Sequence, residues 1–152
     1  MQASVSSATE TAELARDLGT FLKRALTSNN REFFAALQEA DISFTQLKCL
    51  GLLREAGAPV SLGALGDDLV LSPAAVSRAV DGLVQRDALK REEDPEDRRS
   101  KIVSLAPKGR AIYERVMAVR LAGLKDFVEE LLPQEREALG AALHPIVERL
   151  SR

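Results

Sequence analysis

The 152-residue sequence has almost none of the side chains from which metal and redox sites are built. It contains a single cysteine, Cys49, and a single histidine, His144. One cysteine cannot form an intramolecular disulfide, and without a Cys/His cluster there is no basis for a zinc site. We therefore expect neither a metal nor another cofactor.

Long apolar runs and catalytic motifs are missing too. No segment approaches the roughly 20 apolar residues of a membrane helix, and the N-terminal segment lacks the basic start and apolar stretch of a signal peptide. There is no nucleophile elbow, phosphate loop or histidine-supported dyad. These absences predict a cytoplasmic protein that is not an enzyme and has no membrane partner.

The composition is that of a globular protein. Hydrophobic residues make up 45% and charged residues 29%, which excludes wholesale disorder. The formal net charge is -2, so a uniformly basic surface is excluded as well. Binding to nucleic acid would have to depend on the local placement of a few cations.

Helical periodicity dominates the first part of the chain. Apolar residues recur three or four positions apart over residues 9–38, which predicts a long amphipathic helix. The poor helix propensity of residues 27–30 predicts a kink or a break there. Ser43 and Gln46 have the spacing of a capping box, so a second helix begins at this point and ends near Gly57.

Two more helix starts follow closely. Ser61 is placed to cap a short helix that runs through Leu69. Ser72 is placed to cap the next helix, with Pro73 at its first position, and this helix ends near Asp87.

A charged hairpin is predicted after these helices. Residues 88–93 and 100–105 are short segments that favour strands, and β-branched residues mark the second. The segment between them, residues 94–99, is too polar and too charged to be buried. The two strands are therefore expected to form a β-hairpin with a projecting loop, which we call the wing.

Two helices complete the chain. A helix over residues 107–131 is about 37 Å long at about 1.5 Å per residue. It carries two apolar stripes, which imply two packing partners, and the small domain before it is too short to cover both. A last helix begins at Pro133.

The order of these elements predicts the fold class. Helix, short helix, turn, helix and charged hairpin within one short stretch are typical of a winged helix-turn-helix. We expect a mainly α fold with a small β-hairpin wing and long N- and C-terminal dimerisation helices. The expected division is an N-terminal dimerisation helix over residues 1–40, a DNA-binding domain over residues 41–106 and C-terminal dimerisation helices over residues 107–152.

The helix that begins after Ser72 is the predicted reading helix. Its apolar positions face the core, and its other side is small and polar near the N-terminal end, where a helix can approach a major groove closely. The candidate DNA contacts there are Ser72, Ala74, Ser77 and Arg78. Arg78 suits a guanine edge or a phosphate, and the sequence does not separate the two. An ordinary solvated helix face would have the same pattern.

Cations in the wing are the second set of candidates. Arg98 and Arg99 at the tip suit a narrow minor groove, and Lys101 suits a flanking phosphate. The same segment is rich in acidic residues, so an internally paired, solvated loop is the alternative.

Two segments resemble the MarR family of transcriptional regulators. Residues 71–89 resemble its recognition helix with LSPAAVSRAVDGLVQRDAL, and residues 94–110 resemble its wing with DPEDRRSKIVSLAPKGR. The resemblance implies a homodimer that binds a pseudo-palindromic operator in double-stranded DNA and represses transcription. The chain departs from the family at Gly63 and Gly66, which weaken the short helix, and at Ala106, which replaces a capping hydroxyl.

The resemblance also implies control by a small molecule. Members of the family commonly bind small phenolic or aromatic effectors in a cleft beside the winged domain. The residues that would line it are Leu22, Phe33, Phe34 and Leu37. Packing in a dimer core is the alternative for such a stripe.

Two other interpretations remain open. A winged helix can also serve as a protein-interaction module, and a steep salt dependence of DNA affinity would separate the two functions. Cys49 lies in an apolar helix, where a cysteine usually acts as a small buried hydrophobe and less often as a redox sensor.

Overall fold

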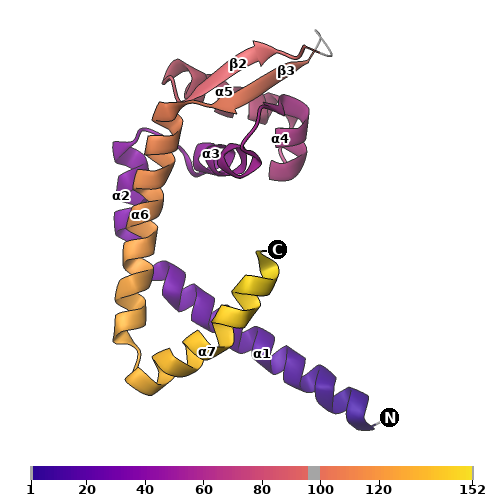
Figure 1. Ribbon diagram of the computed structural model, residues 1–152, viewed down its shortest axis with the longest axis vertical. Helices are drawn as coiled ribbons and strands as arrows, with labels where there is room; N and C mark the ends of the chain where they lie inside the picture. Colours follow the sequence, from indigo (N-terminus) through magenta and orange to yellow (C-terminus); the bar gives the residue numbers. More distant parts are fainter. Residues whose placement is uncertain (1, 96–99, 152) are drawn as a thin grey trace. The chain divides into compact units, whose positions relative to one another are not determined.

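The computed structural model, which describes residues 2–95 and 100–151, is mainly helical with a small antiparallel sheet (Figure 1). This confirms the predicted fold class. None of the helices in the described ranges is both long and apolar enough to span a membrane. The elements in chain order are α1 (Gln2–Thr27), α2 (Asn30–Glu39), α3 (Phe44–Ala56), β1 (Val60–Ser61), α4 (Leu62–Leu69), α5 (Pro73–Gln85), β2 (Leu89–Glu93), β3 (Lys101–Leu105), α6 (Pro107–Glu130) and α7 (Pro133–Leu150).

The chain forms two compact units. The first, which we call the terminal unit, comprises Met1–Asn30 and Arg120–Arg152. The second, which we call the central unit, comprises Arg31–Val119. The central unit contains α2 to α5, the sheet and the first part of α6, whereas the terminal unit contains α1, the rest of α6 and α7. The predicted assignment of dimerisation and DNA binding to parts of the chain stays a prediction.

The start of α3 has the predicted capping box. Ser43 Oγ accepts a hydrogen bond from the Gln46 amide at 3.2 Å, and Gln46 Oε1 accepts one from the Ser43 amide at 2.9 Å. The helix ends at Gly57, whose φ of 62° is the left-handed conformation that glycine adopts without strain. Both boundaries were predicted from local spacing alone.

The starts of the next two helices agree with the sequence as well, whereas α1 begins at Gln2, before the predicted start at residue 9. Ser61 Oγ accepts from the Ala64 amide at 3.1 Å, and Ser72 Oγ accepts from the Ala75 amide at 3.3 Å. The predicted break in the first helix lies between Thr27 and Asn30, where α1 ends and α2 begins.

The core of the central unit brings α2 to α6 and the sheet together. Its fully buried side chains come from every one of the central helices α3 to α6 and from β3; they include Leu50, Leu53, Leu65, Val76, Val80, Leu83, Val103 and Val116. Gly66 lets α4 approach α5 closely, since a Cβ there would lie 3.1 Å from Val76 Cγ2. The glycine that weakens α4 as an isolated helix therefore has a packing role in the fold.

The sheet has three strands, and the sequence predicted only two of them. Its order is β1-β3-β2, with both pairs antiparallel. Val60 pairs with Val103 and Ser61 with Ile102, so β1 adds a short edge to the hairpin. A strand of two residues is too short to show an alternation of apolar and polar residues in the sequence. The sequence therefore predicts only the cap of α4 in this segment.

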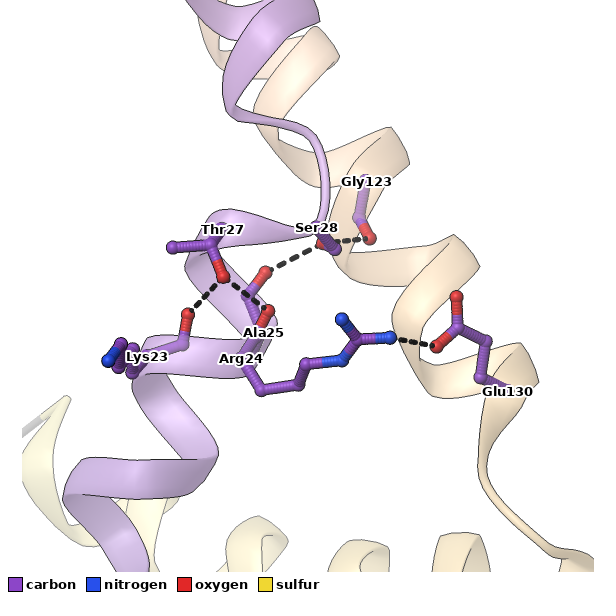
Figure 2. A network of polar contacts seen from close by, with 7 residues as sticks. All are labelled: Lys23, Arg24, Ala25, Thr27, Ser28, Gly123 and Glu130. Carbon is purple, nitrogen blue, oxygen red and sulfur yellow. Dashed lines mark hydrogen bonds and ion pairs between the residues drawn. The ribbon is translucent and has the colours of Figure 1, made fainter.

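In the terminal unit, polar contacts hold the end of α1 against α6 (Figure 2). Arg24 pairs with Glu130 at 3.3 Å, and Ser28 Oγ donates to the carbonyl of Gly123 at 3.4 Å. Arg120 Nη1 donates to the Leu26 carbonyl at 2.6 Å, so it satisfies a carbonyl that the end of α1 leaves open. Phe21 and Phe127 add an edge-to-face ring contact, with centroids 5.2 Å apart.

Large apolar side chains of the terminal unit are exposed to solvent in the described part of the chain. Leu14, Leu18, Leu22 and Leu26 recur every four residues along α1, and all four are 45% or more exposed. Helix α7 has no buried residue, and its apolar positions Leu143, Ile146, Val147 and Leu150 are exposed. Apolar surface on this scale usually marks an interface.

The turn between α4 and α5 contains a strained residue. Val70 has a φ of 54°, which is a rare conformation for a β-branched residue, and its side chain is 91% exposed. An L-residue in this region costs roughly 1–2 kcal/mol, whereas asparagine tolerates it well. No buried contact of Val70 offsets this cost.

Replacement of this residue should stabilise the protein. We expect Val70→Asn to raise the free energy of unfolding by about 1 kcal/mol, because the backbone strain is relieved and little apolar burial is lost. Chemical denaturation measures the change. Val70→Thr keeps the β-branch and is the matched control, so an equal gain in both variants would contradict the explanation.

Candidate nucleic-acid interface

Helix α5 presents two different faces. Val76, Ala79, Val80 and Leu83 are buried against the rest of the central unit. On the other side, the predicted contacts Ser72, Ala74 and Arg78 are exposed and Ser77 is half-buried. The structure therefore brings these four predicted residues together on one accessible face. The N-cap at Ser72 and the helical spacing of the four residues produce this arrangement.

Side chains from α3 and the preceding turn fix the position of α5. Gln46 Nε2 donates to the Ala79 carbonyl at 3.2 Å, and Gly82 leaves room for this amide, since a Cβ there would lie 2.6 Å from Nε2. At the other end, Arg86 Nη1 donates to the Gly82 carbonyl at 2.7 Å, while Arg86 Nη2 pairs with Asp41 at 2.5 Å. Gln46 thus joins the cap of α3 to the reading helix.

The start of α3 widens the candidate surface. A shallow hollow of about 410 Å³ lies between the N-terminal ends of α3 and α5, and it is lined by Ser43, Thr45, Gln46, Leu71, Ala75, Arg78 and Ala79. Thr45 is not among the DNA contacts predicted from the sequence, because nothing local in the sequence indicates that the two helix ends meet. The capping pattern at Ser43 was the one available signal that a helix end lay there.

Most of the described wing cations are paired. Lys101 Nζ lies 2.9 Å from Glu93 Oε1, and this hydrogen bond and charge lower the pKa of the Glu93 carboxyl below its usual range. Arg91 Nη2 lies 2.5 Å from Asp81 Oδ1, whereas Lys90 is exposed. The predicted contact Lys101 is thus held by an acid within the hairpin. The other predicted wing contacts, Arg98 and Arg99, lie outside the described residues.

The residues predicted to line an effector cleft have different environments. Phe33 and Leu37 are 3% and 4% exposed and belong to the core of the central unit. The ring of Phe34 is largely exposed and meets Phe33 edge to face, with centroids 5.6 Å apart. Leu22 belongs to the terminal unit and is exposed. Phe33 and Leu37 are therefore packed in the core of a single chain, and the dimer core that was the alternative for this stripe stays a prediction.

Cys49 is completely buried in α3 among apolar side chains. Desolvation raises the pKa of its thiol from the ordinary value of 9.0 to about 11, because the buried site disfavours the thiolate. The thiolate is the reactive form, so this environment protects the sulfur.

We expect the Cys49 thiol to resist alkylation by iodoacetamide at pH 8 in the folded protein and to react readily after denaturation. Because its folded pKa lies above 9.0, its contribution to stability is complete below that pH and is lost as the pH rises toward about 11. Mass spectrometry of labelled protein checks the first statement, and denaturation at several pH values checks the second. Rapid labelling of the native protein would contradict both.

The described residues offer no metal site. No group of three or more His, Cys, Asp or Glu side chains within them could hold a metal ion. His144 is exposed on α7.

Comparison with known proteins links the chain to one family of regulators. Residues 42–101 match the MarR family. A Bacillus subtilis relative described as an uncharacterized HTH-type transcriptional regulator, YkoM, is 28% identical over 86% of this chain and 84% of its own. The crystal structure of wild-type MarR from E. coli is 25% identical, covers 85% of this chain and 95% of its own, and has a TM-score of 0.67.

A second similar structure is a mutant of S. aureus MepR, solved bound to an oligodeoxyribonucleotide. It is 20% identical, covers 92% of this chain and 97% of its own, and has a TM-score of 0.64, which supports the likeness of fold. The family match spans α3 to the start of β3, which includes the reading helix and the base of the wing. The chain thus contains a MarR-family domain over residues 42–101, and over most of its length it is similar to transcriptional regulators of that family.

Proposed function

We propose that this regulator binds a specific operator in double-stranded DNA through α5 and the wing. The observation that carries the proposal is the exposed face of α5, where Ser72, Ala74, Ser77 and Arg78 lie together around the first turns of a well-anchored helix. Small side chains there allow a close approach to a major groove. The oligodeoxyribonucleotide bound to the MepR mutant supports the same use of this fold.

The proposal includes a homodimer. The uncovered leucines of α1 and the unburied helix α7 supply apolar surface that a second copy of the chain can cover. A two-fold dimer would present two reading helices to successive major grooves about 34 Å apart. The expected operator is therefore pseudo-palindromic, with half-sites one helical turn apart.

We assign the bound protein the role of a repressor that occludes a promoter. Release by a small phenolic or aromatic effector belongs to the same proposal, and the exposed ring of Phe34 supports it as an aromatic surface. An effector can release DNA only by binding the DNA-incompetent state more tightly. A titration of the operator complex with salicylate and benzoate tests this part.

Arg78→Ala should weaken operator binding by roughly tenfold, in the range expected for loss of one base or phosphate contact. Arg78 is exposed and, unlike Arg86 and Arg91, forms no ion pair within residues 2–95 and 100–151. Its guanidinium is thus available to a ligand. Selection of duplexes from a random library, followed by fluorescence anisotropy on the selected sequence, measures the effect.

Arg31→Ala removes an exposed arginine from α2 and is the control, which should bind as tightly as the wild type. Operator affinity should also fall steeply with salt, because bound phosphates release counterions. A protein-interaction module would select no duplex sequence and need not show this slope. Failure to enrich any sequence would count against DNA reading as the function.

A further inference from the structure

A single carboxylate joins the reading helix to the wing. Asp81 lies one turn after Ser77 on α5, and its two oxygens have different partners. Oδ2 accepts a hydrogen bond from Ser77 Oγ at 3.4 Å, and Oδ1 lies 2.5 Å from Nη2 of Arg91 on β2. The residue thus touches one predicted DNA contact and one strand of the wing.

The arginine depends on this contact. The Arg91 side chain is 28% exposed, and its Nε is buried without a hydrogen-bond partner in the described structure. Loss of Asp81 would leave a partly buried cation without its ion-pair partner, which is more costly than loss of a fully exposed pair. The geometry of the guanidinium is therefore fixed by the carboxylate.

Two other ion pairs of the central unit have different roles. Glu93 and Lys101 join the two strands of the hairpin to each other, and Asp41 with Arg86 holds the end of α5 to the turn before α3. Among the ion pairs of residues 2–95 and 100–151, Asp81–Arg91 is the one that joins α5 to a wing strand. This pair is therefore the charged link between α5 and the wing, beside the apolar core that the two elements share.

We infer that Asp81 and Arg91 are a positioning pair that couples the wing to the reading helix, so that both engage one half-site in a fixed relative orientation. The inference rests on the proposed binding of operator DNA. Neither residue has to touch the DNA. Their contribution is to selectivity for the operator, since a duplex is recognised only when both parts meet it together.

For a substitution that removes the Asp81 carboxylate, a purely electrostatic role and a positioning role predict different changes in DNA affinity. Removal of a carboxylate near the reading face makes the surface more positive, which by itself tightens binding to every duplex. Positioning predicts that Asp81→Asn binds the operator more weakly although its net charge has become less negative. The ratio of operator affinity to affinity for a scrambled duplex therefore distinguishes the two roles.

The experiment compares wild-type protein, Asp81→Asn and Arg91→Gln on the selected operator and on a scrambled duplex of the same length. We expect Asp81→Asn to lower the selectivity ratio about tenfold, comparable to loss of one specific contact, while binding to scrambled DNA is unchanged or tighter. Arg91→Gln should lose more operator affinity, because it leaves Asp81 as an unpaired anion facing the phosphates. Hydroxyl-radical footprints should lose the wing's minor-groove protection in both variants.

Glu39→Gln is the matched control, because it also removes one carboxylate charge and breaks an ion pair of the central unit, with Arg115, but leaves the link between α5 and the wing intact. It should retain the wild-type selectivity ratio.

Circular dichroism verifies that the variants fold. If Asp81→Asn does not fold, the comparison is repeated with Asp81→Glu, which keeps the charge but displaces the carboxylate. A wild-type ratio in the Asp81 variant overturns the inference alone, whereas wild-type protein without any operator preference overturns the proposed function and the inference together.

Discussion

An Ile146→Asp variant is expected to be a monomer and to lose at least about a hundredfold in operator affinity. Ile146 is 44% exposed on α7, within an apolar stripe that is exposed in the described structure. A carboxylate there would have to be desolvated in a dimer interface without a partner. A monomer has one reading helix and can contact only one half-site. Linked binding sites commonly increase the overall affinity by about 10² or more, and the monomer loses this gain.

Light scattering coupled to size exclusion measures the mass, and fluorescence anisotropy measures operator affinity. Ala141→Asp adds the same charge to the exposed side of α7 away from the stripe, so this control should remain a dimer. A dimeric Ile146→Asp protein with wild-type affinity would show that α7 is not part of the dimer interface.

Gly109→Ala is expected to lower the free energy of unfolding by about 3 kcal/mol, at the upper end of the usual cost of overpacking. Gly109 is buried in the first turn of α6, and a Cβ there would lie 2.1 Å from the carbonyl oxygen of Ala88. That oxygen cannot move away freely, because it accepts the amide of Ala106 at 3.0 Å. The clash is therefore with the backbone that joins α5 to the wing.

Urea denaturation measures the loss, and Gly63→Ala is the control. A Cβ at Gly63 would meet only Ser61 Oγ, at 3.9 Å, so alanine there should be neutral or stabilising by up to about 1 kcal/mol. A Gly109→Ala protein as stable as the wild type would mean that the helix can shift away from the carbonyl at little cost.

Local signals in the sequence predicted the helices well. Each of Ser43, Ser61 and Ser72 is an N-cap in the structure, because capping depends on atoms within three residues of each other. The poor propensity of residues 27–30 likewise predicted the break between α1 and α2. The reading face followed from helical spacing once the N-terminus of α5 was fixed.

Long-range contacts were not predictable in this way. Asp81 lies at helical spacing from Ser77, and its pairing with Arg91 depends on how the hairpin returns to α5. Gln46 was selected only for its capping box, although its other amide atom also anchors Ala79. Ala106 looked like a missing cap, yet its side chain is buried, which favours a small apolar residue there. Tertiary context determines all three.

The short strand β1 limits the pairing of additional strands with one edge of the sheet. A sheet edge with unpaired backbone groups is a template for aggregation. Along one edge, β1 pairs with Ile102 and Val103 of β3. A longer β1 is prevented by Pro59 before it and by the helix cap Ser61 at its end. The opposite edge, β2, reads LKREE and places four charged side chains along the outer strand. Association of chains through their sheets is thus disfavoured at both edges, which leaves the helices as the surfaces for controlled assembly.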